Sequence, residues 1–252
     1  MTNPAPTLAA PSLRRLALLS IASMAAPQVF AQVVDTNRPG FSATPGIVAT
    51  GHWQLETGVG RDRPDSGSRI LWAPLAEARF GVADGVELFV GPVSWADTAS
   101  NGSSASGLVD AAVGAKVALS DAGAGTRLAV LFQLSVPIGD TDFTTDRWDP
   151  AAALVWAHDG GIPLAGTVRL GHDANGYRLD NGLKLPFVIG GPHSAFLEWQ
   201  ASLPEGGDDE HWLNGGYQWL TEDTLQLDAG AGIGLNDRAG DYRLGLGFSV
   251  LF

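Results

Sequence analysis

The sequence lacks cysteine altogether, and its 252 residues include only five histidines. These absences exclude disulfide staples, a cysteine nucleophile, a zinc finger and a haem-attachment motif. Basic residues are scarce as well, with 15 lysines and arginines against 27 acidic residues. Nucleic acid is a poor partner for such a chain, because phosphate binding relies on lysine and arginine. Sustained helical periodicity is also absent after residue 31, so strands are the expected elements.

The start of the chain has the features of an export signal. Arg14 and Arg15 precede an apolar run over residues 16–26, and the following Val29-Phe30-Ala31 offers small residues at the positions that a signal peptidase reads. The run is far shorter than the roughly 20 residues of a transmembrane helix. We therefore expect residues 1–31 to be a signal peptide cleaved near Ala31. Removal of its two arginines leaves 13 basic residues against 27 acidic ones, a net charge of −14.

The exported part alternates apolar and polar residues, which is typical of strands with two different faces. In residues 125–137, for example, Leu128 and Phe132 share one face, whereas Arg127 and Gln133 share the other. Twelve strands are predicted, within residues 51–60, 70–80, 86–93, 108–119, 125–137, 150–157, 165–170, 183–189, 195–201, 212–220, 224–235 and 241–252.

The connections between these strands alternate in length, which separates two architectures. A soluble sandwich and a membrane barrel both use two-faced strands, but only an outer-membrane barrel has short periplasmic turns and long external loops. Residues 61–68, 95–107, 138–148, 172–181, 203–212 and 236–241 are expected to form the external loops. An even number of strands places both termini on the periplasmic side.

Aromatic residues near the strand ends are expected to form two girdles at the membrane interfaces. The alternative is that they merely end the strands of a sandwich. The girdle beside the long loops would contain Trp72, Trp95, Trp148, Trp199, Trp212 and Tyr242. The girdle beside the short turns would contain Trp53, Phe80, Trp156, Trp219 and Phe252.

If the apolar faces meet lipid, a set of polar side chains of both signs lines the lumen. The predicted lumen-lining residues are Glu56, Glu77, Arg79, Glu87, Asp110, Lys116, Arg127, Gln133, Arg169, Lys184, Glu198, Gln200, Asp228 and Arg243. They would form either a salt-bridge network that fills the interior or a narrow path whose charges select the solute. Inward glycines such as Gly58, Gly230 and Gly247 leave room at the wall, which favours a passage, although glycine also relieves barrel curvature.

Four segments of the chain, residues 35–60, 79–91, 196–199 and 226–252, resemble an outer-membrane transporter-like family labelled "putative MetA-pathway of phenol degradation". The resemblance runs from about Asp35 to Phe252. The family tends to read RPDFT near its start, whereas this chain reads RPGFS over residues 38–42 and so lacks the acidic residue. The resemblance implies a barrel porin and, by its label, passage of aromatic or other small hydrophobic compounds.

Residues 32–50 are too irregular and too rich in proline for a membrane strand. We expect them to form a plug at the periplasmic mouth. In this hypothesis Arg38 is held by a lumen carboxylate such as Glu56, and Phe41 packs against the wall. The alternative is a disordered periplasmic tail.

A histidine-containing segment and two acidic loops are the candidates for an enzyme site and for metal sites. Residues 171–176 follow a lipid-hydrolase signature, but Ala174 stands where the nucleophilic serine would be, so His172 has no hydroxyl to activate. The segment is therefore interpreted as a turn. The acidic loops 139–149 and 205–210 lack the spacing of a calcium-binding loop and are interpreted as solvated charge, with divalent bridging to lipopolysaccharide as the alternative.

Together these patterns predict an all-β protein, a transmembrane antiparallel up-and-down β-barrel of about 12 strands in residues 51–252, in the bacterial outer membrane. We expect passive passage of small hydrophobic or aromatic solutes, without catalysis, cofactor or metal. The alternative is a closed barrel with a structural or envelope-interaction role. The expected partners are outer-membrane lipid and lipopolysaccharide, the solute, and the barrel-assembly machinery, to which the terminal Phe252 would be presented.

Overall fold

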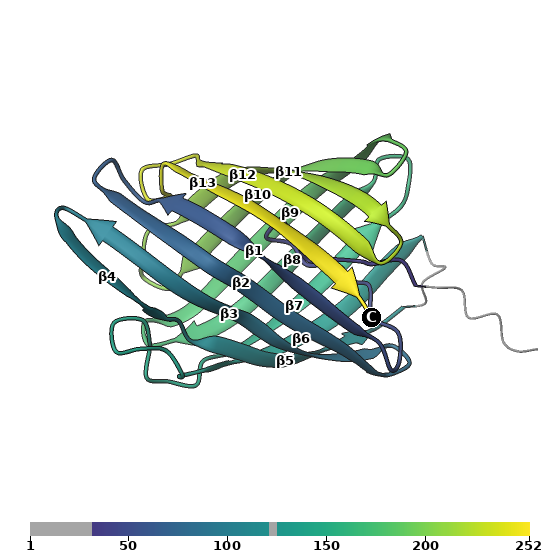
Figure 1. Ribbon diagram of the computed structural model, residues 1–252, viewed down its shortest axis with the longest axis horizontal. Helices are drawn as coiled ribbons and strands as arrows, with labels where there is room; N and C mark the ends of the chain where they lie inside the picture. The colour runs from purple at the N-terminus through teal and green to yellow at the C-terminus, as the bar shows by residue number, and fades with distance from the viewer. Residues whose placement is uncertain (1–31, 121–124) are drawn as a thin grey trace, which may run out of the picture. The chain divides into compact units, whose positions relative to one another are not determined.

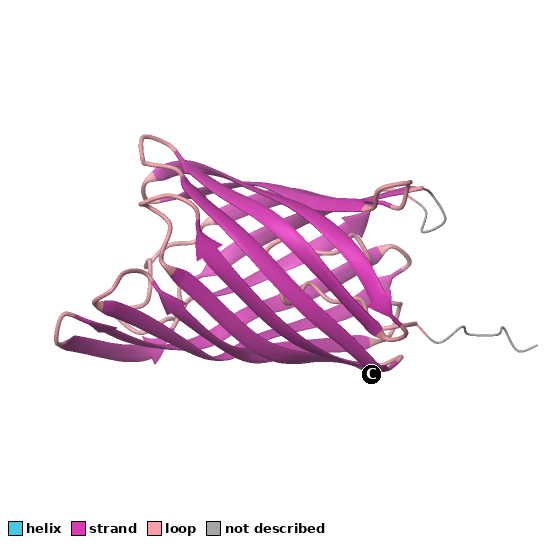
Figure 2. Cartoon of the chain, turned by 90° about the horizontal axis from the view of Figure 1, so that it is seen from above, coloured by secondary structure: helices cyan, strands magenta, loops and turns pink. Residues whose placement is uncertain are grey.

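The computed structural model describes residues 32–120 and 125–252, so the expected signal peptide lies outside the described residues. Thirteen strands form one antiparallel sheet there, and β1 pairs with both β13 and β2 while β2 also pairs with β3. These pairings close the sheet into a barrel (Figures 1 and 2). Within the described residues no helix is long and apolar enough to cross a membrane.

The strands are β1 (Trp53–Arg63), β2 (Ser68–Ala83), β3 (Val86–Ser100), β4 (Ser103–Leu108), β5 (Ala111–Ala118), β6 (Thr126–Val136), β7 (Pro150–His158), β8 (Leu164–Asp173), β9 (Gly176–Gly190), β10 (His193–Pro204), β11 (Glu210–Glu222), β12 (Leu225–Gly234) and β13 (Tyr242–Leu251). Both β4 and β5 pair with β3, one after the other, and a break at Val109 and Asp110 separates them. They occupy a single position in the barrel, which therefore has 12 strand positions. The predicted fold class is confirmed.

The strand faces are arranged with apolar side chains outward and polar side chains inward. In β12, Leu227 and Ile233 are exposed, whereas Gln226 and Asp228 are buried. The largest fully buried side chains of the described residues include Arg79, Lys116, Glu56, Glu87 and Glu198. This distribution is the reverse of a soluble core. It suits a barrel surrounded by lipid, whose closed ladder of hydrogen bonds leaves no strand edge in the bilayer.

The two ends of the barrel differ. The terminal end carries Phe252 and the turns at 84–85, 191–192 and 223–224, whereas the loop end carries the longer connections 137–149 and 235–241 (Figure 1). Two of the expected long loops are wrong. Residues 95–107 belong mostly to β3 and β4, and residues 172–181 belong mostly to β8 and β9. These strands continue beyond the lipid-facing region with mostly polar residues. Apolar and polar residues need to alternate only where one face of a strand meets lipid.

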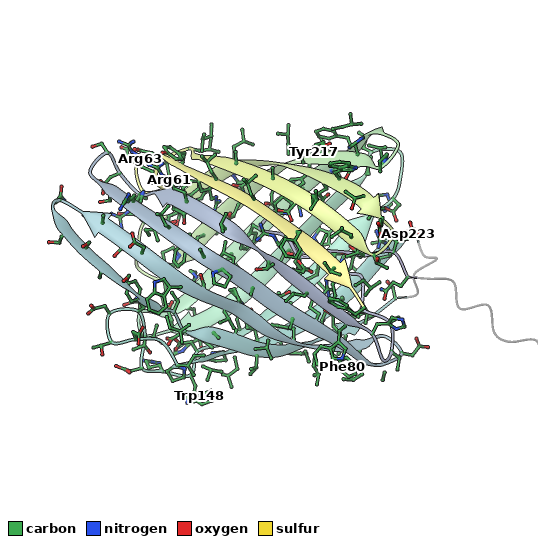
Figure 3. All side chains as sticks on the ribbon, in the orientation of Figure 1. Arg61, Arg63, Phe80, Trp148, Tyr217 and Asp223 are labelled. Carbon is green, nitrogen blue, oxygen red and sulfur yellow. The ribbon has the colours of Figure 1, made fainter. Side chains whose placement is uncertain are left out.

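The predicted girdles are right for some members and wrong for two. Trp95 and Trp199 are exposed near the loop end and Trp53 near the terminal end, and Figure 3 shows Trp148 and Phe80 at opposite ends. Two members of the expected loop-end girdle point inward. They are Trp72, whose Nε1–H donates to Asp62 at 2.8 Å, and Trp212, which is buried with the guanidinium of Arg243 4.1 Å from its ring. A register shift between Trp72 and Leu75 accounts for the first, and the inward parity of β11 for the second.

Candidate functional site

Residues 32–50, called the interior segment below, form no strand and fold into the barrel interior before β1 begins (Figure 2). The segment enters at the terminal end, where the N–H of Val34 donates to the carbonyl of Asp223 at 2.7 Å. It leaves at the same end, where the N–H of Gly51 donates to the carbonyl of Gly81 at 2.8 Å. Between these points it contacts polar side chains of most barrel strands.

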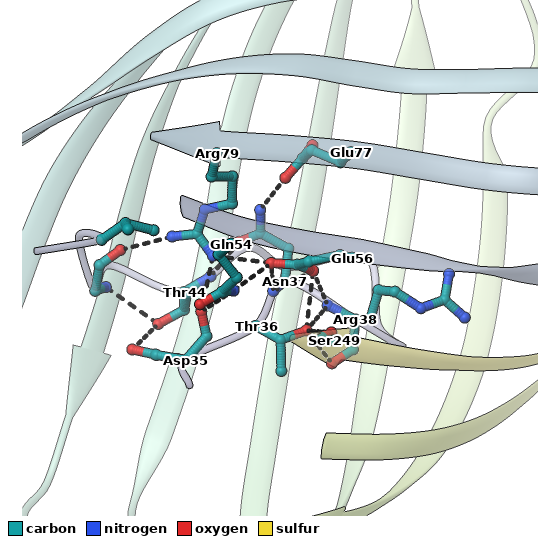
Figure 4. A network of polar contacts seen from close by, with 12 residues as sticks. Asp35, Thr36, Asn37, Arg38, Thr44, Gln54, Glu56, Glu77, Arg79 and Ser249 are labelled. Carbon is teal, nitrogen blue, oxygen red and sulfur yellow. Dashed lines mark hydrogen bonds and ion pairs between the residues drawn. The ribbon is translucent and has the colours of Figure 1, made fainter. Parts of the chain in front are cut away.

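Arg38 makes the strongest side-chain contact of the interior segment. Its Nε and Nη2 donate to the two carboxylate oxygens of Asp228, at 3.2 and 3.1 Å, and the Asp228 side chain has no exposure. Arg38 is thus held by one of the predicted lumen carboxylates, but its side chain pairs with Asp228 and not with Glu56, the example given. The main chain of residues 37–38 lies over Glu56, so this carboxylate accepts their N–H groups, while the Arg38 side chain points away from Glu56 (Figure 4). Its guanidinium reaches Asp228 on β12.

Inward glycines provide the space that the Arg38 side chain fills. Gly58 on β1 and Gly247 on β13 are register partners, and a Cβ atom at either position would collide with the guanidinium of Arg38. Gly230 faces Pro39, where an added Cβ atom would make a tight contact at 3.1 Å. These glycines were expected to leave a passage, but in this structure the room they provide is occupied by the interior segment.

Phe41 packs against the opposite side of the wall. Its ring lies against Gly182 on β9, and the guanidinium carbon of Arg169 is 5.6 Å from the ring centroid. The N–H groups of Phe41 and Ser42 both donate to Glu198, at 2.7 Å each. Lys184 donates to the carbonyl of Ser42 at 2.8 Å.

A buried charge cluster lies beside the interior segment on β1, β2, β3 and β5. Arg79 pairs with Glu56 and with Glu87, both at 2.9 Å, and Lys116 pairs with Glu87 at 3.1 Å. Arg79 also donates to the carbonyl of Asp35 at 2.7 Å. Buried ion pairs are tolerable only when their remaining hydrogen-bonding groups are satisfied, and here the interior segment satisfies several of them.

Other predicted lumen residues also lie inside the barrel. Glu77 accepts a hydrogen bond from the side chain of Asn37 at 2.8 Å (Figure 4). Arg169 pairs with Asp180 at 2.8 Å. Gln133 is only partly buried on β6, and Gln200 is buried and accepts from Arg243.

Three predicted lumen residues lie apart from the central cluster. Arg127, near the terminal end, pairs at 3.5 Å with the exposed Asp159. Arg243 lies towards the loop end, where its Nε donates to Asn214 at 3.0 Å. Asp110, in the break between β4 and β5, accepts hydrogen bonds from the loop 137–149.

The Asp110 carboxylate is specifically hydrogen-bonded by the loop. The N–H groups of Gly139 and Thr145 donate to its two oxygens at 2.9 and 2.7 Å. Burial raises the pKa of Asp110, but the hydrogen bonds from the Thr145 and Gly139 backbone outweigh it, so the pKa lies below its usual value.

Several residues that contact the interior segment were not predicted. Gln54 donates to the carbonyl of Asp35 at 2.9 Å, Gln218 donates to the carbonyl of Arg38 at 2.9 Å, and Thr167 accepts from Ala43. Gln54 and Gln218 have the inward parity of their strands, so a list built on parity alone would have included them. Asp180 was missed because its segment was assigned to a loop.

Two cavities lie on either side of the interior segment. The loop-end cavity has a volume of about 470 Å³ and is lined by Pro39, Phe41, Asp62, Trp72, Leu75 and Arg243, among others. The terminal-end cavity has a volume of about 640 Å³ and is lined by Gln32, Ile47, Thr50, Asp84, Ser120 and Arg127, among others. They share no lining residue, and the interior segment borders both.

The remaining sequence candidates give no catalytic or metal geometry. Asp173 accepts the N–H of Asn175 at 2.7 Å in the turn between β8 and β9, and the His172 ring packs against Tyr177. In the part of the chain that the structure describes, no group of three or more histidine, aspartate or glutamate side chains is arranged to hold a metal ion.

Comparison with protein families gives one match that covers most of the chain. The model of the family described as "Putative MetA-pathway of phenol degradation" matches residues 36–252, in agreement with the resemblance noted in the sequence. No curated protein matches the sequence significantly.

Solved structures share the barrel at low sequence identity. An outer membrane channel from Pseudomonas putida F1 has a TM-score of 0.63 and 14% identity, with 85% of this chain and 99% of that chain covered. The NanC porin has a TM-score of 0.51 and 9% identity, covering 78% and 98%. The translocator domain of the autotransporter NalP from Neisseria meningitidis has a TM-score of 0.50 and 13% identity, covering 81% and 89%. These likenesses concern the fold.

Proposed function

Because the chain belongs to the family described as "Putative MetA-pathway of phenol degradation", we propose that it is a passive outer-membrane channel for small hydrophobic or aromatic solutes. The fold is that of outer-membrane channels, and the neighbours named above are a channel, a porin and a translocator domain. In this proposal the loop end faces outward and the terminal end faces the periplasm, as in barrels with an even number of strands.

The observation that carries the solute class is the loop-end cavity. Its volume of about 470 Å³ is within the usual range of small-molecule sites, which are mostly apolar with a few polar groups. Phe41, Trp72 and Leu75 supply apolar surface, and Asp62 and Arg243 supply polar groups. Such a cavity suits a small aromatic molecule with one polar substituent better than a strongly hydrated sugar or ion.

Passage through the barrel would require the interior segment to move, because it lies between the two cavities. We propose that Arg38 and Phe41 act as parts of a plug, and that the predicted lumen charges line the path when the plug shifts. The same proposal includes a signal peptide that is cleaved near Ala31 and contact of the barrel with lipopolysaccharide. It also includes presentation of Phe252 to the barrel-assembly machinery. Phe252 is exposed, as that presentation requires.

A second candidate function is a closed barrel with a structural or envelope-interaction role. The observation in its favour is the extent of hydrogen bonding between the interior segment and the wall, which a rigid filling would also have. Planar-bilayer conductance of the wild type separates the two, because a permanently filled barrel gives no current steps. A variant lacking residues 35–49 tests the plug: larger current steps than in the wild type are expected, and unchanged currents would remove the plug from the proposal.

The solute class is tested by binding to the protein in lipid nanodiscs, with phenol and toluene as probes. Trp72→Ala is expected to weaken binding about tenfold, which corresponds to about 1.4 kcal/mol of lost contact. Trp95→Ala is the matched control, because Trp95 is exposed on the outer surface of the neighbouring strand. Equal binding by both variants and the wild type would contradict a role for the loop-end cavity.

A further inference from the structure

Buried carboxylates of the wall bind the interior segment through its main chain. Glu198 accepts the N–H groups of Phe41 and Ser42, and Glu87 accepts the N–H of Val48 at 2.8 Å. Both carboxylates are almost completely buried. Hydrogen bonds from backbone N–H groups to a carboxylate are charge-assisted and stronger than those between neutral groups.

Cationic side chains of the wall bind the carbonyl groups of the same segment. Lys184 donates to the carbonyl of Ser42 at 2.8 Å, and Lys116 donates to that of Thr44 at 3.0 Å. Arg79 donates to the carbonyl of Gly46 at 3.1 Å. The segment bends at residues 39–42 and folds back on itself, with Thr44 N–H donating to Asn37 and Ala49 N–H donating to Gln32. The wall supplies acceptors and donors in alternation along its second arm, as a peptide-binding groove does.

Among the described residues, the side chains of residues 41–48 contribute no hydrogen bond to the wall. The Thr44 hydroxyl donates to Asp35 within the segment itself. The Ser42 hydroxyl is buried and has no hydrogen-bond partner in the described part of the chain. Recognition of this stretch therefore relies on groups that every residue except proline carries, and side-chain pairing is concentrated upstream at residues 36–38.

From this arrangement we propose that the barrel interior is a main-chain recognition site for a peptide that folds back on itself, and that the interior segment is its tethered occupant. A peptide of the same length that is not covalently attached takes the same place once the tethered segment is released. The ligand class is a peptide that can bend back on itself, with small side chains and an arginine that reaches Asp228. This inference does not depend on solute passage.

The test uses the full chain with a protease site inserted between Thr50 and Gly51. Thr50 and Gly51 are exposed at the terminal end, and added atoms at Gly51 would meet nothing within 4 Å. After folding and cleavage, the segment becomes a bound peptide. A fluorescent synthetic peptide of residues 32–50 is expected to exchange with it saturably, as measured by anisotropy.

Two modified peptides separate main-chain from side-chain recognition. N-methylation at Phe41 and Ser42 removes the two N–H groups that Glu198 accepts, and binding is expected to weaken at least about tenfold. Ser42→Ala removes only the unpartnered hydroxyl and is expected to bind within about threefold of the parent peptide. Equal binding of the parent and N-methylated peptides would overturn the proposal.

A second measurement covers the case in which the cleaved barrel does not remain folded. The uncleaved Arg38→Met variant keeps its tether but loses the ion pair with Asp228. We expect a maleimide to label an Ala43→Cys substitution in this variant several-fold faster when the parent peptide of residues 32–50 is present at millimolar concentration. The N-methylated peptide is expected to leave the labelling rate unchanged. Labelling that is unchanged by any peptide would also overturn the proposal.

Discussion

At the scale of single residues, charge pairing and glycine placement organise the interior together. Asp228 has no exposure, so its charge is stable there only because Arg38 donates to both of its oxygens. The bidentate geometry requires the guanidinium to lie flat against β1 and β13, where Gly58 and Gly247 leave the wall without side chains. Asp228, Gly58 and Gly247 thus form one binding site for a single arginine.

The glycine seat, formed by Gly58 and Gly247, gives a sharp residue-level prediction. Gly247→Ala places a methyl group in contact with the Arg38 guanidinium, so the ion pair with Asp228 must shift. The matched control is Gly245→Ala, two residues away in β13, where the nearest atom to the added Cβ is 3.7 Å away, an ordinary contact. We expect maleimide labelling of an Ala43→Cys reporter to rise about tenfold with Gly247→Ala and to stay unchanged with Gly245→Ala. Equal labelling in both would show that the seat does not hold the segment.

At the scale of elements, two neighbouring strands show that the position of a residue in the alternating pattern decides whether its side chain points out of the barrel or into it. Trp199 on β10 and Trp212 on β11 lie at the same level, since Gln200 is the register partner of Trp212. Trp199 is 40% exposed and Trp212 is 9% exposed. One tryptophan therefore faces the surroundings of the barrel and the other faces Arg243 inside it.

Brominated lipids test this assignment in two single-tryptophan variants, which keep Trp199 or Trp212 alone of the eight tryptophans. Fluorescence of Trp199 is expected to be quenched strongly, because its ring meets lipid, and that of Trp212 only weakly. A reversed order would show that the strand faces are assigned the wrong way round, since a shift by one residue exchanges the two faces of a strand.

The break between β4 and β5 gives an element-level prediction of pH dependence. The pKa of Asp110 is lowered in the folded state, so its hydrogen bonds to the loop 137–149 are fully present above the unfolded pKa and are lost as the pH falls through the folded one. The loop is expected to become mobile in acid below the usual carboxyl range, about pH 4. A probe on Thr141→Cys, an exposed position of the same loop, is expected to report this mobility, and in an Asp110→Asn background the signal should no longer depend on pH in that range. A pH response that persists in the Asp110→Asn background would contradict the assignment, because the substituted amide does not titrate.

At the scale of the whole molecule, the barrel is a shell with lipid-compatible side chains outside and a charged, hydrogen-bonded filling inside. The filling is a segment of the same chain that enters and leaves at the terminal end. Neither the wall charges nor the segment would be satisfied alone, because each supplies hydrogen-bond partners to the other. In the channel proposed above, opening of the barrel would require the whole interior segment to move.

A reversible lock tests this dependence. The hydroxyl oxygens of Thr36 and Ser249 are 3.1 Å apart, so the pair Thr36→Cys and Ser249→Cys is close enough for a disulfide. The chain has no other cysteine to compete. Oxidation is expected to suppress current steps at least about tenfold in planar bilayers, and reduction is expected to restore them. Either single substitution alone should show no redox response, and identical currents in the oxidised and reduced double variant would exclude movement of this part of the segment.

Much of the fold follows from the sequence by itself. Period-two alternation is a local property, so it determined the all-β class, the number of strand positions and the face on which residues such as Glu56, Arg79 and Asp228 lie. The family resemblance likewise rests on short stretches of sequence. Prediction from the sequence failed in the hairpin of β3 and β4, where apolar and polar residues no longer need to alternate. It also failed at Trp72, where a register shift exchanges the inward and outward faces of the strand.

Only the tertiary structure decided which inward groups meet. Arg38 and Asp228 are 190 residues apart in the chain, and nothing local distinguishes Asp228 from Glu56 as the partner of Arg38. The position of the interior segment likewise depends on closure of the barrel, which brings β1 beside β13 and the seat glycines beneath one guanidinium. Alternation states which way a side chain points, whereas a pairing between distant charges depends on strand register and on the path of a segment without regular structure.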